Sequence, residues 1–87
     1  MKIDWETIDR GRCGMMQRGF VDGKKAYWIT YKIRGSRGRV SASYVITPGD
    51  PGRTRHLGDP CDDYWFRNIT EAKKACQEHL EKQENNR

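Results

Sequence analysis

The stretch that decides the fold is Tyr27-Trp28-Ile29-Thr30-Tyr31-Lys32-Ile33-Arg34. Its odd-numbered positions carry only large apolar or aromatic residues, whereas its even-numbered positions carry one Trp, one Thr and two cations. Alternation with a period of two, in a run rich in β-branched and aromatic residues, is typical of a strand with one buried face. The sequence therefore predicts a β-sheet whose second face presents Trp28 and positive charge.

Two further strands flank this one. Asp22-Gly23 tolerates the positive φ angles of a tight hairpin turn, so the preceding residues 15–21 are predicted to pair with it. Gly35-Ser36-Arg37-Gly38 indicates a second turn, followed by a strand over residues 39–47. The apolar face of this third strand would hold Val40, Ala42, Tyr44 and Ile46. Residues 15–47 are thus predicted to form an antiparallel meander with one solvated side.

A helix is predicted over residues 68–82. Asn68 is suited to the N-cap position and Glu71 to the third helical position of a capping box. Apolar residues then recur on one narrow stripe, made up of Ile69, Ala72, Cys76 and Leu80. The predicted fold class is α+β: an antiparallel β-meander of three to four strands packed against one C-terminal α-helix.

The remaining segments are expected to be less regular. Residues 1–14 are interpreted as a lead-in, either a helical turn or extended, and residues 48–63 as a long loop. A short strand near Arg55-His56-Leu57 is allowed within that loop, and Tyr64-Trp65-Phe66 is expected to plug the core with aromatic rings. At this length, residues 1–87 are expected to form a single small domain.

The charge of the chain is segregated. Residues 10–55 hold eleven Lys and Arg but only two acids, a balance of +9, whereas residues 1–9 and 56–87 each carry −2. Such asymmetry is typical of an electrostatic contact surface, because cations bind phosphates and an indole can stack on a base. The alternative is that these cations have no partner and only protect the edges of a solvated sheet from pairing with other chains. The predicted contact residues are Trp28, Lys32, Arg34, Arg37, Arg39, Arg53 and Arg55.

No metal, cofactor or enzymatic activity is predicted. His56, Cys61, Cys76 and His79 have His-x4-Cys and Cys-x2-His spacings, which match no standard zinc motif. We therefore expect Cys76 to be a core residue and the histidines to lie at the surface, with zinc as the alternative. Four acids lie near the predicted helix start: Asp59, Asp62, Asp63 and Glu71. Negative charge at a helix N-terminus interacts favourably with the helix dipole. No nucleophile–base pair or phosphate-cradling motif accompanies them.

A resemblance bears on function. The segments Tyr27-Trp28-Ile29-Thr30-Tyr31 and Phe66-x-x-Ile69-x-Glu71-Ala72-Lys73, after a Trp-bearing start and Asp22-Gly23, resemble small phage and mobile-element proteins. The predicted sheet and helix are also similar to the arm-binding domains of tyrosine integrases and to plant-type AP2 domains, which place sheet cations and aromatics in DNA. The first resemblance implies a non-enzymatic phage accessory protein, anti-CRISPR-like, that inhibits a host defence nucleic-acid-processing complex. The alternative is a direct DNA- or RNA-binding regulator.

Composition sets the expected cellular setting. No apolar run approaches the ~20 residues of a membrane span, and no signal-peptide hydrophobic region is recognisable near Met1. Three cysteines at irregular spacing do not form a disulfide framework, so the expected location is the host cell cytoplasm, with reduced thiols. The expected partner is a host nucleoprotein complex or nucleic acid. Because short chains bury only about 60–65% of their unfolded surface, formation of a homodimer would add stability.

Overall fold

The computed structural model describes residues 2–9, 11, 14–31, 40–46, 50 and 52–85, and only the main chain of Asp62. Within these ranges the elements are β1 (Asp4–Asp9), β2 (Met15–Val21), β3 (Lys24–Tyr31), β4 (Val40–Val45), β5 (Thr54–Leu57), the 3₁₀ helix η2 (Pro60–Asp62), β6 (Trp65–Phe66) and α1 (Ile69–Asn85).

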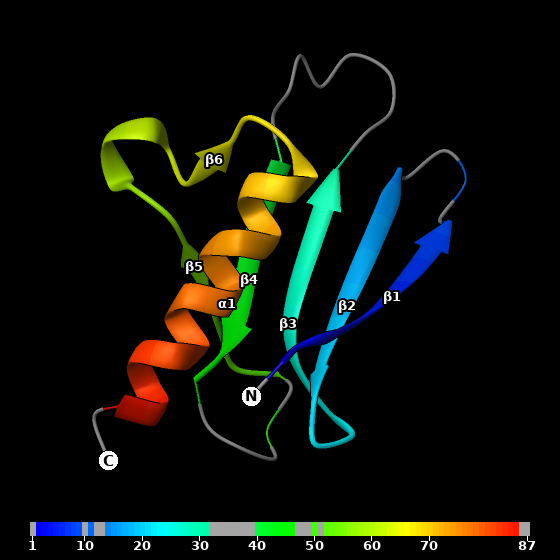
Figure 1. Ribbon diagram of the computed structural model, residues 1–87. Coiled ribbons are helices and arrows are strands. Elements are labelled where there is room, and N and C mark those ends of the chain that lie inside the picture. Colours follow the sequence, from blue (N-terminus) through cyan, green and yellow to red (C-terminus); the bar gives the residue numbers. More distant parts are fainter. Residues whose placement is uncertain are drawn as a thin grey trace.

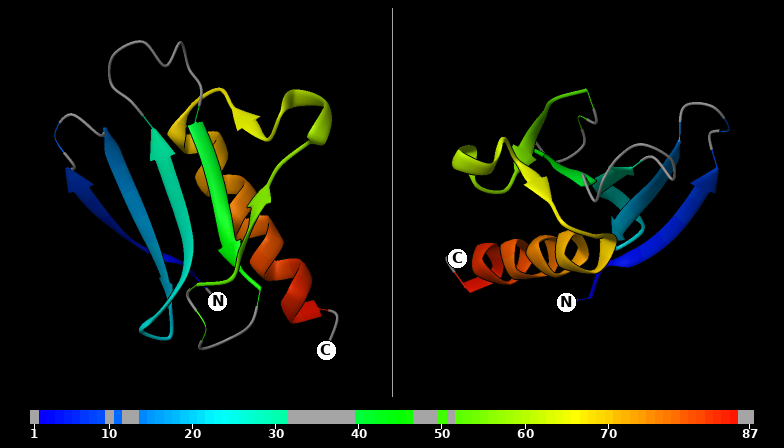
Figure 2. Two further views of the ribbon diagram at one scale, coloured as in Figure 1. Left: turned by 180° about the vertical axis from the view of Figure 1, so that it is seen from behind. Right: turned by 90° about the horizontal axis from the view of Figure 1, so that it is seen from above.

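The strands form one antiparallel sheet in the order β1-β2-β3-β4-β5, and β6 pairs with β4. Helix α1 lies across one face of this sheet and runs beside β3 and β4 (Figure 1). The view from above in Figure 2 places the helix on a single side. The predicted α+β class, a meander packed against one C-terminal helix, is confirmed, and the sheet has five to six strands rather than three to four.

The first hairpin forms as its sequence predicts. Asp22 and Gly23 have φ angles of 53° and 76°, the left-handed values that a tight turn between twisted strands requires. Strand β2 spans the predicted residues 15–21 and pairs with β3. In the next pair, Tyr27 lies opposite Tyr44 and Ile29 opposite Ala42. The described members of the two apolar sets therefore share one face, as predicted, except Ile46, which lies beyond β4 and is 43% exposed.

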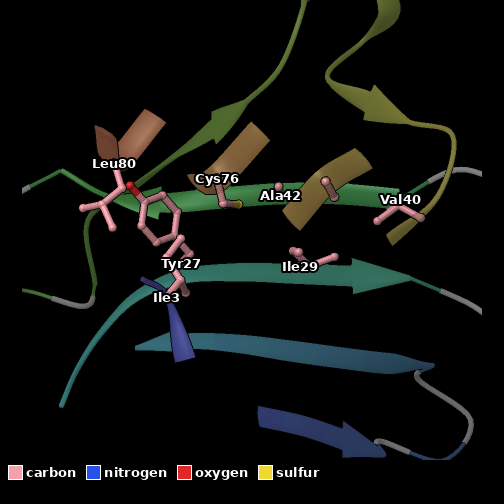
Figure 3. Packing of buried hydrophobic residues seen from close by; sticks show 8 residues of the cluster. Ile3, Tyr27, Ile29, Val40, Ala42, Cys76 and Leu80 are labelled. Atoms are coloured by element: carbon pink, nitrogen blue, oxygen red, sulfur yellow. The ribbon is translucent and has the colours of Figure 1, made fainter. Parts of the chain in front are cut away.

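The core lies between this face and α1 (Figure 3). Its buried residues are Ile3, Tyr27, Ile29, Val40, Ala42, Ala72, Cys76 and Leu80. The predicted helix stripe is confirmed, because Ala72, Cys76 and Leu80 are buried and Ile69 packs against them. Ile29 and Cys76 are fully buried and mark the centre of the contact between sheet and helix.

The predicted lead-in is in fact an edge strand. β1 pairs with β2 along its whole length, and the N–H of Ile3 donates to Oε1 of Gln77 in α1 at 3.2 Å. Ile3 and Trp5 rest on Gly19, where an added Cβ would lie 2.8 Å from Ile3 Cγ2 and 2.9 Å from the Trp5 ring. The absence of a side chain at Gly19 thus lets the start of the chain close over the sheet.

Within the predicted loop 48–63, residues 52–63 are more regular than a loop. β5 extends the sheet at residues 54–57, where the sequence allowed a short strand, and η2 follows it. The expectation that Tyr64-Trp65-Phe66 would plug the core is wrong for two of the three rings, since Tyr64 is 36% exposed and Trp65 is 42% exposed. Of the three, Phe66 packs against the core, whereas Trp65 points to the other face because successive residues of a strand do so, and Tyr64 precedes β6 with a φ of 62°.

Asn68 caps α1 as predicted, and its Oδ1 accepts the N–H of Glu71 at 2.8 Å. Replacing Asn68 by alanine removes this acceptor and is expected to lower the free energy of unfolding by about 1 kcal/mol. Chemical denaturation followed by circular dichroism measures the change. Thr70→Ala, an exposed substitution in the same helical turn, is the matched control; an equal loss in both variants would contradict the assigned cap.

Candidate functional site

Among the described elements, α1 covers one face of the sheet, and the face opposite α1 is the candidate contact surface. Figure 2 shows it from behind, with β4 and β5 in front of the helix and β2 and β3 beside them. Directly opposed residues of antiparallel strands point to the same side, so the strand pairing fixes its membership. We call this surface the open face. Its residues are Asp4, Glu6 and Ile8 of β1, Met16, Arg18 and Phe20 of β2, Lys25, Trp28 and Thr30 of β3, Ser41, Ser43 and Val45 of β4, Thr54 and His56 of β5, and Trp65 of β6.

Three aromatic side chains cross the open face on a diagonal. Phe20 on β2 lies one strand from Trp28, and Arg18, two residues before Phe20, lies directly opposite Trp28. Trp65 on β6 lies opposite Ser41, two strands beyond Trp28 and two residues further along the sheet. With strands about 4.8 Å apart and residues about 3.3 Å apart, the diagonal from Phe20 to Trp65 spans about 20 Å along the sheet. None of the three rings belongs to the core cluster.

Two cations lie beside the central indole. Lys25 Nζ lies 4.8 Å from the centroid of the Trp28 ring, within cation–π distance. Arg18 lies between Glu6 and Trp28 in one cross-strand row, and its buried Nε has no hydrogen-bond acceptor among the described residues. A buried guanidinium N–H without an acceptor carries a desolvation penalty, which an incoming anion close to the guanidinium group would reduce.

Small polar groups occupy the part of the open face between Trp28 and Trp65. Thr30 Oγ1 and Ser41 Oγ are 2.6 Å apart, so one hydroxyl donates to the other. Ser43 Oγ lies 3.4 Å from His56 Nδ1, and the His56 ring stacks on Tyr64 with centroids 5.7 Å apart. Hydroxyl groups both donate and accept, which suits hydrogen bonds to sugars, base edges and phosphates.

The predicted contact residues are only partly described. Trp28 lies at the centre of the open face, whereas Lys32, Arg34, Arg37 and Arg39 lie outside the described residues. Arg55 lies opposite Tyr44 and therefore on the helix-covered side of the sheet, away from Trp28. Arg53 precedes β5 and lies 3.6 Å from Asp50 in an exposed ion pair. Arg55 and Trp28 thus lie on opposite faces of the sheet and do not form one surface.

Apart from Trp28, sequence reasoning missed every aromatic or basic member of the open face: Arg18, Phe20, Lys25, His56 and Trp65. The alternation within residues 15–21 carried a usable signal, since Met16, Arg18 and Phe20 share the side opposite Gln17 and Gly19. Lys25 follows from its pairing with Phe20 after an irregularity in the register. Trp65 had no local signal, because β6 has only two residues.

The candidate zinc ligands have other surroundings. Cys76 is a core residue, as predicted, and burial raises the pKa of its thiol to about 12. His79 Nδ1 lies 2.8 Å from Tyr27 Oη. Burial and the nearby Lys82 lower the pKa of the His79 imidazole, and burial raises that of the Tyr27 phenol, so both groups stay neutral near pH 7. In the part of the chain that the structure describes, no three His, Cys, Asp or Glu side chains gather where a metal ion could bind.

Comparison of the chain with protein-family models, with curated proteins and with solved structures finds no match. Among the residues that the structure describes, no helix is both long enough and apolar enough to cross a membrane.

Proposed function

We propose that the protein is a non-enzymatic binding protein that contacts nucleic acid through the open face of its sheet. The observation that carries the proposal is the placement of Arg18 and Lys25 beside the half-buried Trp28. A planar apolar ring flanked by cations matches a base next to a phosphate. The +9 balance of residues 10–55, which include β2, β3 and β4, supplies attraction at longer range.

A second candidate function is inhibition of a host defence complex, as a phage-type accessory protein of the anti-CRISPR kind. The apolar residues Ile8, Met16 and Val45 on the open face favour it, because apolar side chains gain more against a protein surface than against phosphates. In that case the open face would occlude a site on a host nucleic-acid-processing complex instead of binding a free strand.

The salt dependence of binding separates these two functions. Labelled DNA and RNA are titrated with the protein, with Mg²⁺ present, at roughly 50 and 200 mM salt. If the protein contacts about four phosphates of a single strand, the Kd is expected to rise roughly 50-fold across this range. Failure to bind either polymer at the lower salt would overturn the proposal and favour the inhibitor, whereas degradation of the strands would contradict a non-enzymatic protein.

A matched pair of variants tests whether the cation that contacts phosphate lies on the open face. Arg18→Gln removes a cation beside Trp28, whereas Arg55→Gln removes an exposed cation on the helix-covered side. Loss of one phosphate contact reduces the slope of log K against log salt by about 0.7 for a single strand. We expect this change for Arg18→Gln alone, and the reverse result would place the contact surface on the helix side.

A further inference from the structure

We infer that the open face takes single-stranded rather than double-stranded nucleic acid, with unpaired bases stacked on Phe20, Trp28 and Trp65. The inference rests on the proposed function and names the class of ligand. Its basis is the diagonal of rings across the sheet, together with the width of the sheet itself.

The rings require bases whose flat faces are free. In a duplex each base is stacked between its neighbours, so only a single strand can lay its bases on side chains of a sheet. Sheet-face aromatics of this kind stack about two or three bases in single-strand-binding modules. Trp65 is 42% exposed and is therefore accessible from solvent.

The polar groups follow the same diagonal. Arg18 and Lys25 lie next to Phe20 and Trp28 at one end, where they can bind the phosphates that link two stacked bases. The hydroxyl pair of Thr30 and Ser41 lies between Trp28 and Trp65, within reach of sugars or base edges. A strand laid along the diagonal would therefore meet cations first and hydroxyl groups afterwards.

The width of the sheet opposes binding in a duplex groove. Five neighbouring strands span about 19 Å, whereas the major groove of B-DNA is about 12 Å wide. A narrow ribbon can enter such a groove, but this face cannot. The β1 edge carries Asp4, Glu6 and Asp9, whose carboxylates repel phosphates, so a bound strand would keep to β2, β3, β4 and β6 and away from β1.

The test compares oligonucleotides about 12 nucleotides long, which is within the site sizes of single-strand-binding folds. Fluorescein-labelled oligo(dT), oligo(U) and a duplex of equal length are titrated against the protein by anisotropy. We expect the single strands to bind and the duplex to bind at least about 10-fold more weakly. Trp28→Ala and Trp65→Ala should each weaken single-strand binding about 5- to 150-fold, the range that stacking of one base gives.

Trp28→Phe keeps a ring on the sheet and should restore much of the affinity, which separates stacking from damage to the fold. Because Trp65 is exposed on a two-residue strand, its alanine variant tests the same point with little risk to the core. Equal binding of duplex and single strand would overturn this inference but keep the proposed function. Binding of neither polymer would overturn both, and unchanged affinity of both alanine variants would show that the strand lies elsewhere.

Discussion

Replacing Ile29 by alanine is expected to lower the free energy of unfolding by about 2–5 kcal/mol. Ile29 is 0% exposed and lies in the middle of β3, between Gln17 on β2 and Ala42 on β4. Alanine would leave a cavity beneath α1 that neighbouring side chains can fill only in part. A domain of this size typically has a free energy of unfolding of about 4–13 kcal/mol, so this substitution would remove a large fraction of it.

Urea denaturation followed by circular dichroism measures this loss. Ile8→Ala is the matched control, since it makes the same chemical change in a strand but on the open face. It is expected to cost about 1 kcal/mol or less. Equal losses in the two variants would mean that the sheet has no distinct buried face, against the assigned packing.

The second large effect concerns thiol reactivity. The thiolate is the reactive form of cysteine, and burial raises the pKa of the Cys76 thiol from its usual value near 9 to about 12. At a given pH below both values, the thiolate population of Cys76 is lower by about 10³-fold, since each pKa unit is a factor of ten. Because a thiolate of higher pKa is also more nucleophilic, we expect iodoacetamide to modify Cys76 in the native protein at least about 30-fold more slowly than an unburied thiol.

Mass spectrometry of peptides after timed labelling measures the rates, and Cys61, which is exposed in η2, is the internal reference. In denaturant the two cysteines should react at similar rates, because burial is then lost. Rapid labelling of Cys76 in the native protein, at the rate of Cys61, would contradict its position in the core.

The parts of the fold that the sequence predicted are those fixed by local chemistry. The positive-φ turn at Asp22 and Gly23, the alternation within β3 and the cap at Asn68 each depend on residues close together in the chain. The sequence did not predict β1 as a strand, because half of its residues are acidic. Its strand conformation depends on pairing with β2. The Trp5 ring can pack against the sheet because Gly19, fourteen positions later, has no side chain there.

The candidate site was predicted only at its centre. Trp28 was assigned correctly to the side of β3 opposite the apolar set, since one strand is enough to define its two sides. The grouping of Phe20, Trp28 and Trp65 depends on the register of four strands, which no local pattern encodes. For the same reason Arg55 was grouped with Trp28 on charge alone, although its pairing with Tyr44 places it on the other side.

The hydrogen bond from Ile3 to Gln77 joins positions 74 residues apart and has a consequence for the order of folding. Most other pairings in the sheet link strands that follow one another in the chain, and such contacts of short sequence separation form quickly. We therefore expect the junction of the first and last segments to form late, after the folding barrier is crossed. Contacts made after the barrier govern how long the native state survives. We expect loss of Ile3 to shorten the native lifetime and to leave the folding rate almost unchanged.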